Sequence, residues 1–257
     1  MLNAHVFREK IAAGGPLLAA GVTLADPVVT EVLSRWVDLI WIDAEHGPLT
    51  SHQVQGHLQA ASVRGCPVVV RVPTGDVGFV KHVLDAGADG IVAPQVRASE
   101  EARRMVAACR YPPLGARGFG PRRAADYGQA RGIDYPARAN TEVLAFVMLE
   151  DRGAVAELDA ILAIPGLDGV VIGPADLSAS FGVIGQIDHP EVQAAIDTVI
   201  TRTRERGKIV GVGGGDDPGA ARAWFARGVQ WMQIGGDFGY LATHVRRVVE
   251  AIRGVAV

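Results

Sequence analysis

The sequence alternates short apolar runs with longer amphipathic stretches, and this alternation restricts the possible fold more than any other feature. Eight runs of six to eight residues are almost continuously apolar. Such runs are typical of strands that are buried on both faces of a parallel sheet. The predicted strands are 16–23, 37–43, 67–72, 88–94, 143–150, 167–174, 208–214 and 229–236.

The stretches between these runs have the periodicity and the caps of helices. Residues such as Thr50, Asp76 and Ser99 stand where helix N-caps are expected. The one irregular stretch is 110–142, a length that usually marks a functional loop or an interface in a compact domain. The predicted helices are 26–35, 50–63, 76–86, 98–109, 151–163, 190–206, 216–227 and 237–253.

Eight β/α units in a chain of 257 residues predict a (β/α)₈ barrel with an extra C-terminal helix. We find no linker or change of composition, so residues 1–257 are expected to form a single domain. An open, doubly wound sheet is the alternative. The barrel prediction has a direct consequence, because catalytic residues of such barrels lie at the C-terminal ends of the strands.

The composition argues against several classes of protein, including nucleic-acid-binding, membrane-spanning and disulfide-rich proteins. The net charge of −3 and the scattered arginines do not indicate a nucleic-acid partner. No apolar run approaches the roughly 18 residues of a membrane span, and the polar N-terminus does not resemble a secretory signal. Two cysteines, Cys66 and Cys109, cannot form a disulfide framework and are expected to be structural. We therefore expect a cytoplasmic protein.

Three ionisable residues, Asp43, Glu45 and His46, follow the second predicted strand, and Arg71 ends the third. Four such groups at one rim of a barrel are typical of one wall of an active site. The alternatives are a polar turn that caps the next helix, an ordinary turn histidine, and an arginine that forms a structural salt bridge with Asp43 or Glu150.

Glu150 ends the fifth predicted strand, and Asp176 follows the sixth. A carboxylate at the end of a buried apolar strand is costly to desolvate unless it has a partner. Because these strands are neighbours, the two carboxylates can converge on one cation, and hard oxygen ligands suit Mg²⁺ or Mn²⁺. The alternative is that each residue caps the helix after its strand.

The three lysines are placed unfavourably for a Schiff base. Lys10 falls in a further predicted helix at the N-terminus, Lys81 falls in the predicted helix 76–86, and Lys208 falls at the start of a strand. None is at a strand's C-terminal end, where an amine could reach substrate. The glycines of 211–215 and 234–236 stand where many barrels bind phosphate, although glycine is also common in any tight turn.

Several separate motifs, in order and in register, resemble one family over nearly the whole chain. They are "WIDAEHGP", "RVP", "VLDAGADGIVAPQV", "EEARRMVAACRYPPLGARGFG", "MLE" and "GPADLSASFG". Together they resemble the metal-dependent (class II) pyruvate aldolases of the HpcH/HpaI group. The resemblance implies a (β/α)₈ barrel enzyme with two substrates. One is a small 2-oxo acid, either pyruvate or hydroxypyruvate, and the other is an aldehyde.

The resemblance also implies a metal and substrate site. Glu150 and Asp176 would hold a divalent ion that chelates the 2-oxo acid, with Mg²⁺ or Mn²⁺ favoured and Co²⁺ or Zn²⁺ as further candidates. The backbone of the GPAD turn, at Gly173 and Ala175, would help to bind the substrate carboxylate. Asp176 therefore counts as both a metal and a substrate residue.

For the chemical step, the resemblance implies that His46 is the acid–base group and that Asp85 raises its basicity. Arg71 would stabilise the enolate oxygen. A histidine, whose ordinary pKa is about 6.5, suits proton transfer near neutral pH. The chain departs from the family at Met148, where many members have a glutamine that contacts substrate, so the preferred donor is open.

A reversible aldolase is thus the favoured function. The alternatives are an acyl-CoA lyase of the citrate-lyase β-subunit type and a non-catalytic barrel that binds a 2-oxo acid. The resemblance implies a homo-oligomer, a hexamer whose C-terminal helices are exchanged between neighbours. Arginines 117, 122 and 123 of the long loop are candidates for holding an acidic acceptor aldehyde, with surface or interface salt bridges as the alternative.

Overall fold

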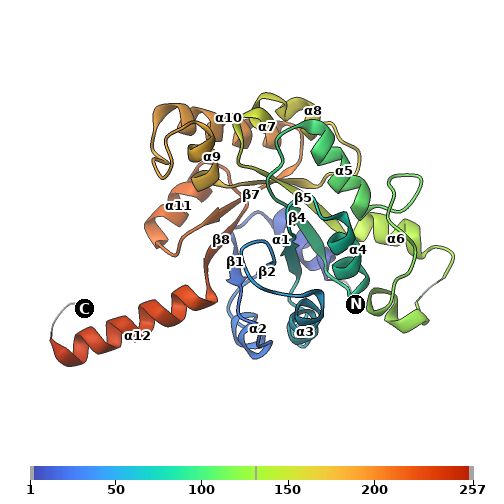
Figure 1. The fold of residues 1–257 in the computed structure, drawn as a ribbon, viewed down its shortest axis with the longest axis horizontal. Helices are drawn as coiled ribbons and strands as arrows, with labels where there is room; N and C mark the ends of the chain where they lie inside the picture. Colours follow the sequence, from blue (N-terminus) through green and yellow to red (C-terminus); the bar gives the residue numbers. More distant parts are fainter. Residues whose placement is uncertain (1–2, 131, 255–257) are drawn as a thin grey trace.

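Eight parallel strands close into a barrel in the computed structural model, which describes residues 3–130 and 132–254 (Figure 1). Each strand pairs with its neighbour in sequence, and β1 pairs with β8. The closed barrel confirms the predicted fold and excludes the open sheet. The strands are β1 (Leu17–Val22), β2 (Leu39–Asp43), β3 (Val68–Arg71), β4 (Gly90–Ala93), β5 (Leu144–Leu149), β6 (Gly169–Ile172), β7 (Ile209–Gly214) and β8 (Trp231–Gly236).

Helices surround the barrel, as expected for β/α units. The predicted helix 151–163 is in fact two short helices that meet at Glu157. The helices are α1 (Ala4–Ala13), α2 (Val28–Leu33), α3 (Ser51–Ser62), α4 (Val77–Asp85), α5 (Ser99–Cys109), α6 (Tyr135–Glu142), α7 (Arg152–Ala156), α8 (Leu158–Leu162), α9 (Pro174–Ser180), α10 (Pro190–Glu205), α11 (Pro218–Ala226) and α12 (Asp237–Arg253).

The long stretch 110–142, of which residues 110–130 and 132–142 are described, contains more regular structure than its sequence suggests. It contains a 3₁₀ segment, η1 (Arg123–Gly128), and the helix α6. Tyr111 and Tyr135 are buried with their ring centroids 6.2 Å apart. The sequence pattern missed α6 because this helix is only two turns long, and only Tyr135 and Ala139 of its residues are buried.

Large side chains fill the interior of the barrel and close its N-terminal end. Trp231 and Phe146 point inward, with ring centroids 5.6 Å apart. Phe7 of α1 packs edge-on against both rings, at 6.1 Å and 6.2 Å. A second apolar layer separates the strands from the helices. With its N-terminal mouth plugged, the barrel is open to a ligand only at the C-terminal ends of the strands.

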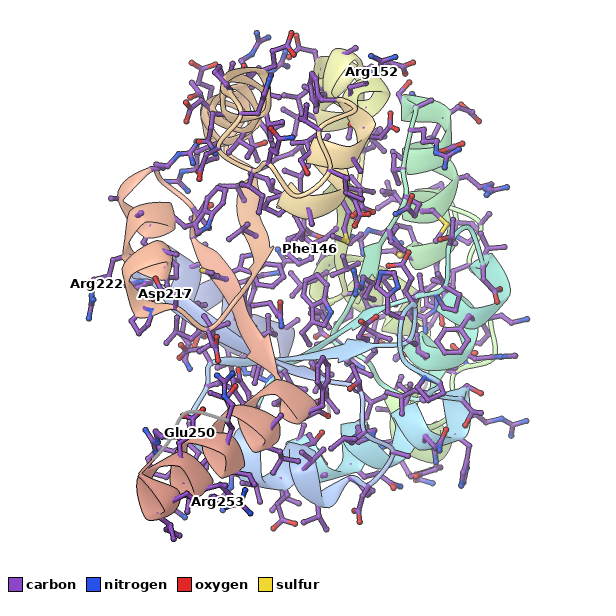
Figure 2. The ribbon with its side chains drawn as sticks, turned by 60° about the vertical axis from the view of Figure 1, so that its left-hand side comes forward. Phe146, Arg152, Asp217, Arg222, Glu250 and Arg253 are labelled. Atoms are coloured by element: carbon purple, nitrogen blue, oxygen red, sulfur yellow. The ribbon has the colours of Figure 1, made fainter. Side chains whose placement is uncertain are left out.

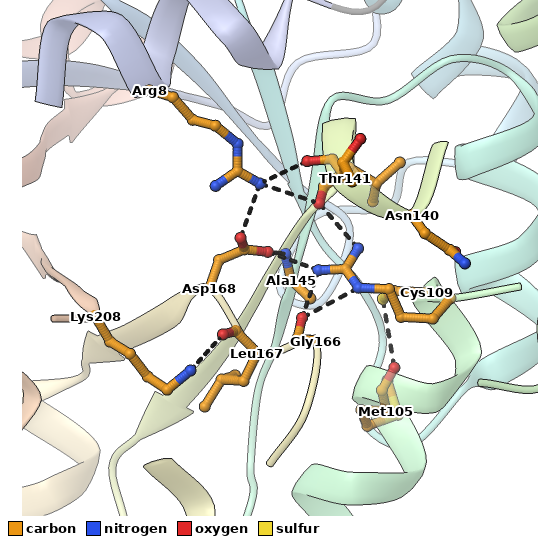
Figure 3. A network of polar contacts seen from close by, with 12 residues as sticks. Arg8, Met105, Cys109, Asn140, Thr141, Ala145, Gly166, Leu167, Asp168 and Lys208 are labelled. Atoms are coloured by element: carbon orange, nitrogen blue, oxygen red, sulfur yellow. Dashed lines mark hydrogen bonds and ion pairs between the residues drawn. The ribbon is translucent and has the colours of Figure 1, made fainter. Parts of the chain in front are cut away.

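A partly buried ion cluster, in which Arg110 is the most buried member, fixes the beginning of β5 and β6 on the side of the barrel away from that opening (Figure 3). Asp168 accepts hydrogen bonds from Arg8 at 2.8 Å, from Arg110 at 2.7 Å and from the amide of Ala145 at 2.7 Å. Removing one partner of a buried ion pair typically costs about 3–5 kcal/mol. The cluster therefore holds these strands in place without taking part in a site.

The C-terminal helix α12 extends away from the barrel (Figures 1 and 2). Only its first residue, Asp237, is buried. The Asp237 carboxylate accepts hydrogen bonds from the amides of Thr23 and Leu24, both at 2.8 Å, which ties the helix to the loop after β1. Among the described residues no helix, α12 included, is both long and apolar enough to cross a membrane.

Both cysteines are buried and unpaired, as the sequence predicted. Burial raises the pKa of the Cys66 thiol to about 12 and that of Cys109 to about 11. Because the thiolate is the reactive form, these thiols are inert near neutral pH. They are structural residues of the barrel wall.

Candidate active site

Asp43 organises the loop that follows β2. In the register between β2 and β3, Asp43 lies beside Arg71. Its carboxylate accepts hydrogen bonds from Arg71 Nε at 3.0 Å and Nη2 at 2.5 Å, and also from the amides of Glu45 and His46. Burial by itself would raise the pKa of Asp43, but Arg71 and these amides hold it below its ordinary value. Asp43 therefore positions both the guanidinium and the turn that carries His46.

Glu45 is the second carboxylate at Arg71. Its Oε2 lies 3.3 Å from Arg71 Nη1 and 3.7 Å from His46 Nε2. Burial raises the pKa of Glu45, and the charge of Arg71 opposes this. The side chain of His46 is 63% exposed and faces open space. The alternative of a structural salt bridge for Arg71 is thus partly correct: Asp43 and Glu45 hold it, and it still lines the cavity described below.

Glu150 follows β5 directly and is 3% exposed. Its Oε1 accepts a hydrogen bond from the amide of Gln95 at 2.6 Å, and its buried Oε2 has no partner among the described residues. Burial raises the pKa of Glu150 to about 7, and the nearby charges of Glu45 and Asp176 add to this. Gly173 permits the close approach of β6, since a Cβ there would lie 2.5 Å from Oε2.

The helix-cap alternatives are wrong for both candidate metal ligands. The cap of α7 is Asp151, whose Oδ1 accepts from the amide of Gly153 at 2.7 Å, so Glu150 does not serve as a cap. The N-cap of α9 is Gly173, and Asp176 lies two residues inside that helix with its side chain exposed. Neither carboxylate caps the helix that follows its strand, and each has a carboxylate oxygen that could bind a ligand.

These carboxylates fit a divalent cation. Glu150 presents an unpartnered, buried oxygen, and Asp176 is close enough to raise the pKa of Glu150 by its charge. Within the described ranges, no three His, Cys, Asp or Glu side chains gather as a metal site. The chain thus offers two candidate carboxylate ligands, and a hard ion such as Mg²⁺ held there would need water or substrate oxygens as its further ligands.

A cavity of about 880 Å³ opens at the C-terminal ends of the strands and brings most of the predicted residues together. Met148 forms part of its wall, 3% exposed, with its Sδ 4.0 Å from Arg71 Nη1. Glycines at the C-terminal ends of β7 and β8 also line it, and the lack of side chains there leaves space for a ligand. The predicted site residues that line the cavity are His46, Arg71, Gly173, Ala175 and Asp176.

Asp85 does not lie beside His46 in the same chain. It ends α4, at the opposite rim of the barrel from the strand end that carries His46, and a nine-residue helix spans roughly 13 Å. Its carboxylate instead accepts from Arg117 Nη2 at 2.8 Å. The predicted dyad between Asp85 and His46 is therefore not formed within one subunit, because the helix carries Asp85 away from the site.

Two of the three loop arginines are also not available to a substrate in their own chain. The side chain of Arg117 is 1% exposed and pairs with Asp85, with its guanidinium 4.6 Å from the ring centre of Tyr111. Arg123 is buried and donates to the carbonyl of Ala86 at 3.2 Å. Of the three, only Arg122 is exposed. Arg117 and Arg123 are therefore structural residues of this loop.

The lysines lie where the sequence placed them. Lys10 pairs with Asp38 at 2.7 Å, and Lys208 donates to the carbonyl of Leu167 at 2.7 Å near the start of β7. Lys81 lies in α4, and none of the three lines the cavity. The sequence did not reveal the role of Gln95, whose backbone has a φ of 54° and directs its amide at Glu150.

Comparison with known proteins gives consistent matches over most of the chain. The family model for HpcH/HpaI aldolase/citrate lyase matches residues 22–242. A hydroxypyruvate/pyruvate aldolase of Roseobacter denitrificans is 36% identical over 241 residues, which are 92% of this chain and 93% of that protein. A 4-hydroxy-2-oxo-heptane-1,7-dioate aldolase of Salmonella paratyphi C is 38% identical over 239 residues, covering 93% and 90%. A crystal structure of an HpcH/HpaI aldolase/citrate lyase family protein from Burkholderia cenocepacia J2315 superposes with a TM-score of 0.89 at 33% identity, covering 96% and 98%.

Proposed function

Because this chain belongs to the HpcH/HpaI aldolase/citrate lyase family, we propose that it joins a pyruvate-type enolate to an aldehyde in a metal-dependent, reversible aldol reaction. The product is a 4-hydroxy-2-oxo acid. The enzyme is an aldehyde-lyase, like its named relatives. One observation supports the metal-dependent route above all: the buried, unpartnered oxygen of Glu150 close to the carboxylate of Asp176.

The donor 2-oxo acid binds in the cavity of about 880 Å³, called the donor cavity below. Glu150 and Asp176 would hold a divalent ion, Mg²⁺ or Mn²⁺ with Co²⁺ or Zn²⁺ as further candidates, which supplies Lewis-acid stabilisation of the developing enolate. Arg71 adds a fixed positive charge on the same wall, and preorganised charge of this kind usually contributes strongly to catalysis. The turn at Gly173 and Ala175 takes the substrate carboxylate, which is supported by its place in the cavity lining.

His46 transfers the proton. In the cleavage direction it takes the proton from the hydroxyl on the carbon that becomes the aldehyde, and in synthesis it returns it. Its exposure and its place on the cavity wall support this role. Among the described residues of one chain, the carboxylate that contacts the His46 side chain is that of Glu45, at 3.7 Å, so a contribution of Asp85 would require a second subunit.

The two other functions are disfavoured. An acyl-CoA lyase needs a basic groove for the nucleotide, but two arginines of the 117–123 cluster, Arg117 and Arg123, are buried in structural contacts. A non-catalytic 2-oxo-acid-binding barrel would not require His46 beside the same cavity as Arg71 and Asp176. The observed set contains a proton-transfer group as well as ligand contacts.

The function is tested by incubating the protein with Mn²⁺, pyruvate and a short aldehyde and detecting a 4-hydroxy-2-oxo acid. Glu150→Gln and Asp176→Asn should abolish turnover and weaken Mn²⁺ binding, and His46→Ala should lower kcat by about 10²-fold or more. Asp151→Asn is the matched control, since it lies next to Glu150 and serves only the α7 cap. Near wild-type activity of either carboxylate variant, after chelation and readdition of metal, would refute the assignment.

We also infer that the protein is a homo-oligomer, a hexamer by analogy with the family. Apolar side chains along α12 that its own barrel leaves exposed support this inference. A cytoplasmic location is supported by the two buried, unpaired cysteines. The exposed apolar residues of α12 are Phe238, Leu241, Val245, Val248 and Ile252.

A further inference from the structure

Glu45 is a second carboxylate beside Arg71, although one carboxylate already holds that guanidinium. Asp43 accepts hydrogen bonds from Arg71 Nε at 3.0 Å and from Nη2 at 2.5 Å. Glu45 adds a contact of 3.3 Å between its Oε2 and Arg71 Nη1, and this buried oxygen accepts no hydrogen bond from the described residues. Because a buried carboxylate is costly unless it is well paired, the contact with Arg71 does not by itself account for Glu45.

The charges around Arg71 do not balance while His46 is neutral. Two carboxylates, those of Asp43 and Glu45, face one guanidinium, which leaves one negative charge over. The same Oε2 of Glu45 that contacts Arg71 lies 3.7 Å from Nε2 of His46. When His46 takes the proton of the substrate hydroxyl, its imidazolium supplies the one positive charge that balances the group.

The carboxylate of Glu45 is fixed in place before that proton arrives. The amides of Glu45 and His46 donate to Asp43 Oδ1 at 3.0 Å and 3.2 Å, which holds the turn that carries both side chains. Thr74 Oγ1 donates to Glu45 Oε1 at 3.3 Å, so the other oxygen, Oε2, is the one that faces the imidazole. Burial raises the pKa of the Glu45 carboxyl, whereas the charges of Arg71 and His46 lower it.

Glu45 is the carboxylate that a single chain places at His46. Other charged side chains line the two cavities that His46 borders, among them Asp176 in the donor cavity and Arg97, Glu101 and Arg104 in a second cavity of about 490 Å³. Within residues 3–130 and 132–254, no carboxylate other than that of Glu45 lies within 4.0 Å of a ring nitrogen of His46. The charge that acts most directly on the imidazole is therefore that of Glu45.

We propose that Glu45 is a positioning residue of the proton-transfer step, which orients the His46 imidazole and stabilises the imidazolium that forms when His46 takes the proton. Glu45 itself gains no proton: the proton moves from the substrate hydroxyl to His46 and returns in the reverse direction. A preorganised charge beside a developing charge is an effective form of catalysis. The proposal rests on the proposed aldolase function. It gives a residue of the same chain the role that the family resemblance gives to Asp85.

The test follows cleavage of 4-hydroxy-2-oxopentanoate, the aldol of pyruvate and acetaldehyde, at saturating Mn²⁺. Glu45→Gln keeps the shape of the side chain and removes its charge. It should lower kcat about 5-fold or more, because opposite unit charges about 4 Å apart attract each other appreciably even in water. The acidic limb of kcat against pH should move down by about 0.5–1 pH unit, because without this carboxylate the imidazole stays neutral to lower pH. Thr74→Val, which releases Oε1, should cause a smaller loss in the same direction.

Two further measurements separate this role from one of merely holding Arg71. Oxalate is a planar analogue of the pyruvate enolate, and Glu45→Gln should weaken its inhibition by less than about twofold, because Asp43 keeps both of its hydrogen bonds to the guanidinium. In a His46→Ala background, Glu45→Gln should lower kcat by less than about a further twofold, since a residue that acts through His46 then has nothing to act on.

Glu101→Gln is the matched control, because Glu101 lines the same second cavity as Glu45 but accepts from the amide of Arg97 at 2.8 Å. It should change neither kcat nor the pH profile. The proposal is overturned if Glu45→Gln has the kcat and profile of the wild type, weakens oxalate as much as it lowers kcat, or causes its full loss without His46. An acidic limb that moves in Asp85→Asn but not in Glu45→Gln also overturns it. Each of these outcomes leaves the aldolase function standing, whereas a wild type that neither cleaves nor condenses overturns both.

Discussion

At the scale of single residues, the buried and half-buried charges of the site, Asp43, Glu45 and Arg71, have defined partners. Arg71 is held between Asp43 and Glu45, with ion-pair distances of 2.5 Å and 3.3 Å. A guanidinium fixed in this way keeps its position as charge develops on a substrate oxygen, which is the condition for electrostatic catalysis. Glu150 is the exception, because one of its buried oxygens has no partner in the described chain.

The pairing of Asp85 with Arg117 leads to a prediction about stability. Asp85→Asn removes the charge that neutralises Arg117, whose side chain is 1% exposed, while that of Asp85 is 16% exposed. We expect a loss of about 3 kcal/mol in the free energy of unfolding, at the lower end for a broken buried pair because Asp85 is partly exposed. Urea denaturation measures this change, with the solvent-exposed Glu100→Gln as the control. An unchanged unfolding midpoint together with an altered pH–rate profile would instead favour the catalytic role implied by the family.

Met148 leads to a prediction about the donor. Its thioether lies beside Arg71 in the wall of the donor cavity and offers no N–H or O–H donor to a hydroxyl group. Met148→Gln should raise the ratio of kcat/KM for hydroxypyruvate over pyruvate by about 10-fold, which corresponds to one hydrogen bond of about 1 kcal/mol or slightly more. Met148→Leu keeps the volume without a donor and should leave the ratio unchanged. A similar ratio in the Gln and Leu variants would show that Met148 does not set donor preference.

At the scale of elements, the junction of β3 and β4 contains a buried acid outside the site. Asp89 accepts hydrogen bonds from the amides of Asn3 and Val68, the latter at 2.8 Å. Burial raises the pKa of Asp89 to about 7, although these amides and the charge of Arg123 favour the carboxylate. Asp89 thus connects the segment before α1 to the two strands. Its contribution to the free energy of unfolding depends on pH.

The sign of this dependence follows from proton linkage. Between the ordinary pKa of 3.8 and the folded-state pKa of about 7, the unfolded chain has lost a proton that the folded chain retains. The contribution of Asp89 to the free energy of unfolding should therefore decrease as pH rises from about 4 to about 7 and then level off. Urea denaturation of wild type and Asp89→Asn across this range tests it, because the variant lacks the titrating carboxyl. Parallel pH curves for the two proteins would contradict the prediction.

At the scale of the whole molecule, α12 carries apolar side chains that a single chain leaves exposed to solvent. Its exposed apolar residues Leu241, Val245, Val248 and Ile252 recur at intervals of three and four, which forms one stripe along the helix. Ile252 is 80% exposed. A stripe of this kind on a helix that extends from the barrel is typical of an interface.

We therefore predict that a charge on the stripe disrupts assembly. Leu241→Glu and Val245→Glu should each shift the protein to smaller species in multi-angle light scattering, because the unpaired carboxylate would have to be desolvated in the interface. Thr243→Glu, which is also exposed but lies on the opposite side of α12, is the control and should not change the mass. A monomeric wild type, or equal effects of all three substitutions, would contradict an interface on this stripe.

The periodicity of the sequence determined the barrel, and strand-end positions identified most residues of the donor site. Apolar runs and helix caps report burial and backbone geometry along the chain, and in a closed parallel barrel all strand ends meet at one rim. The sequence by itself therefore places His46, Arg71 and Asp176 on one cavity, with Glu150 beside it. The absence of lysine from that rim could be predicted in the same way.

Only the tertiary structure decided which charged groups are available. By sequence, Arg117, Arg122 and Arg123 were the candidates for the acceptor, yet Arg117 and Arg123 are buried. Arg104 on α5 instead lines a cavity beside His46. Asp85 was expected at His46 and lies at the other rim. These outcomes depend on how separate loops and helices approach one another in space, and on which charges they pair. The periodicity of the sequence predicts neither the approach of these segments nor the pairing of their charges, because contacts between distant segments are set by strand register and loop conformation.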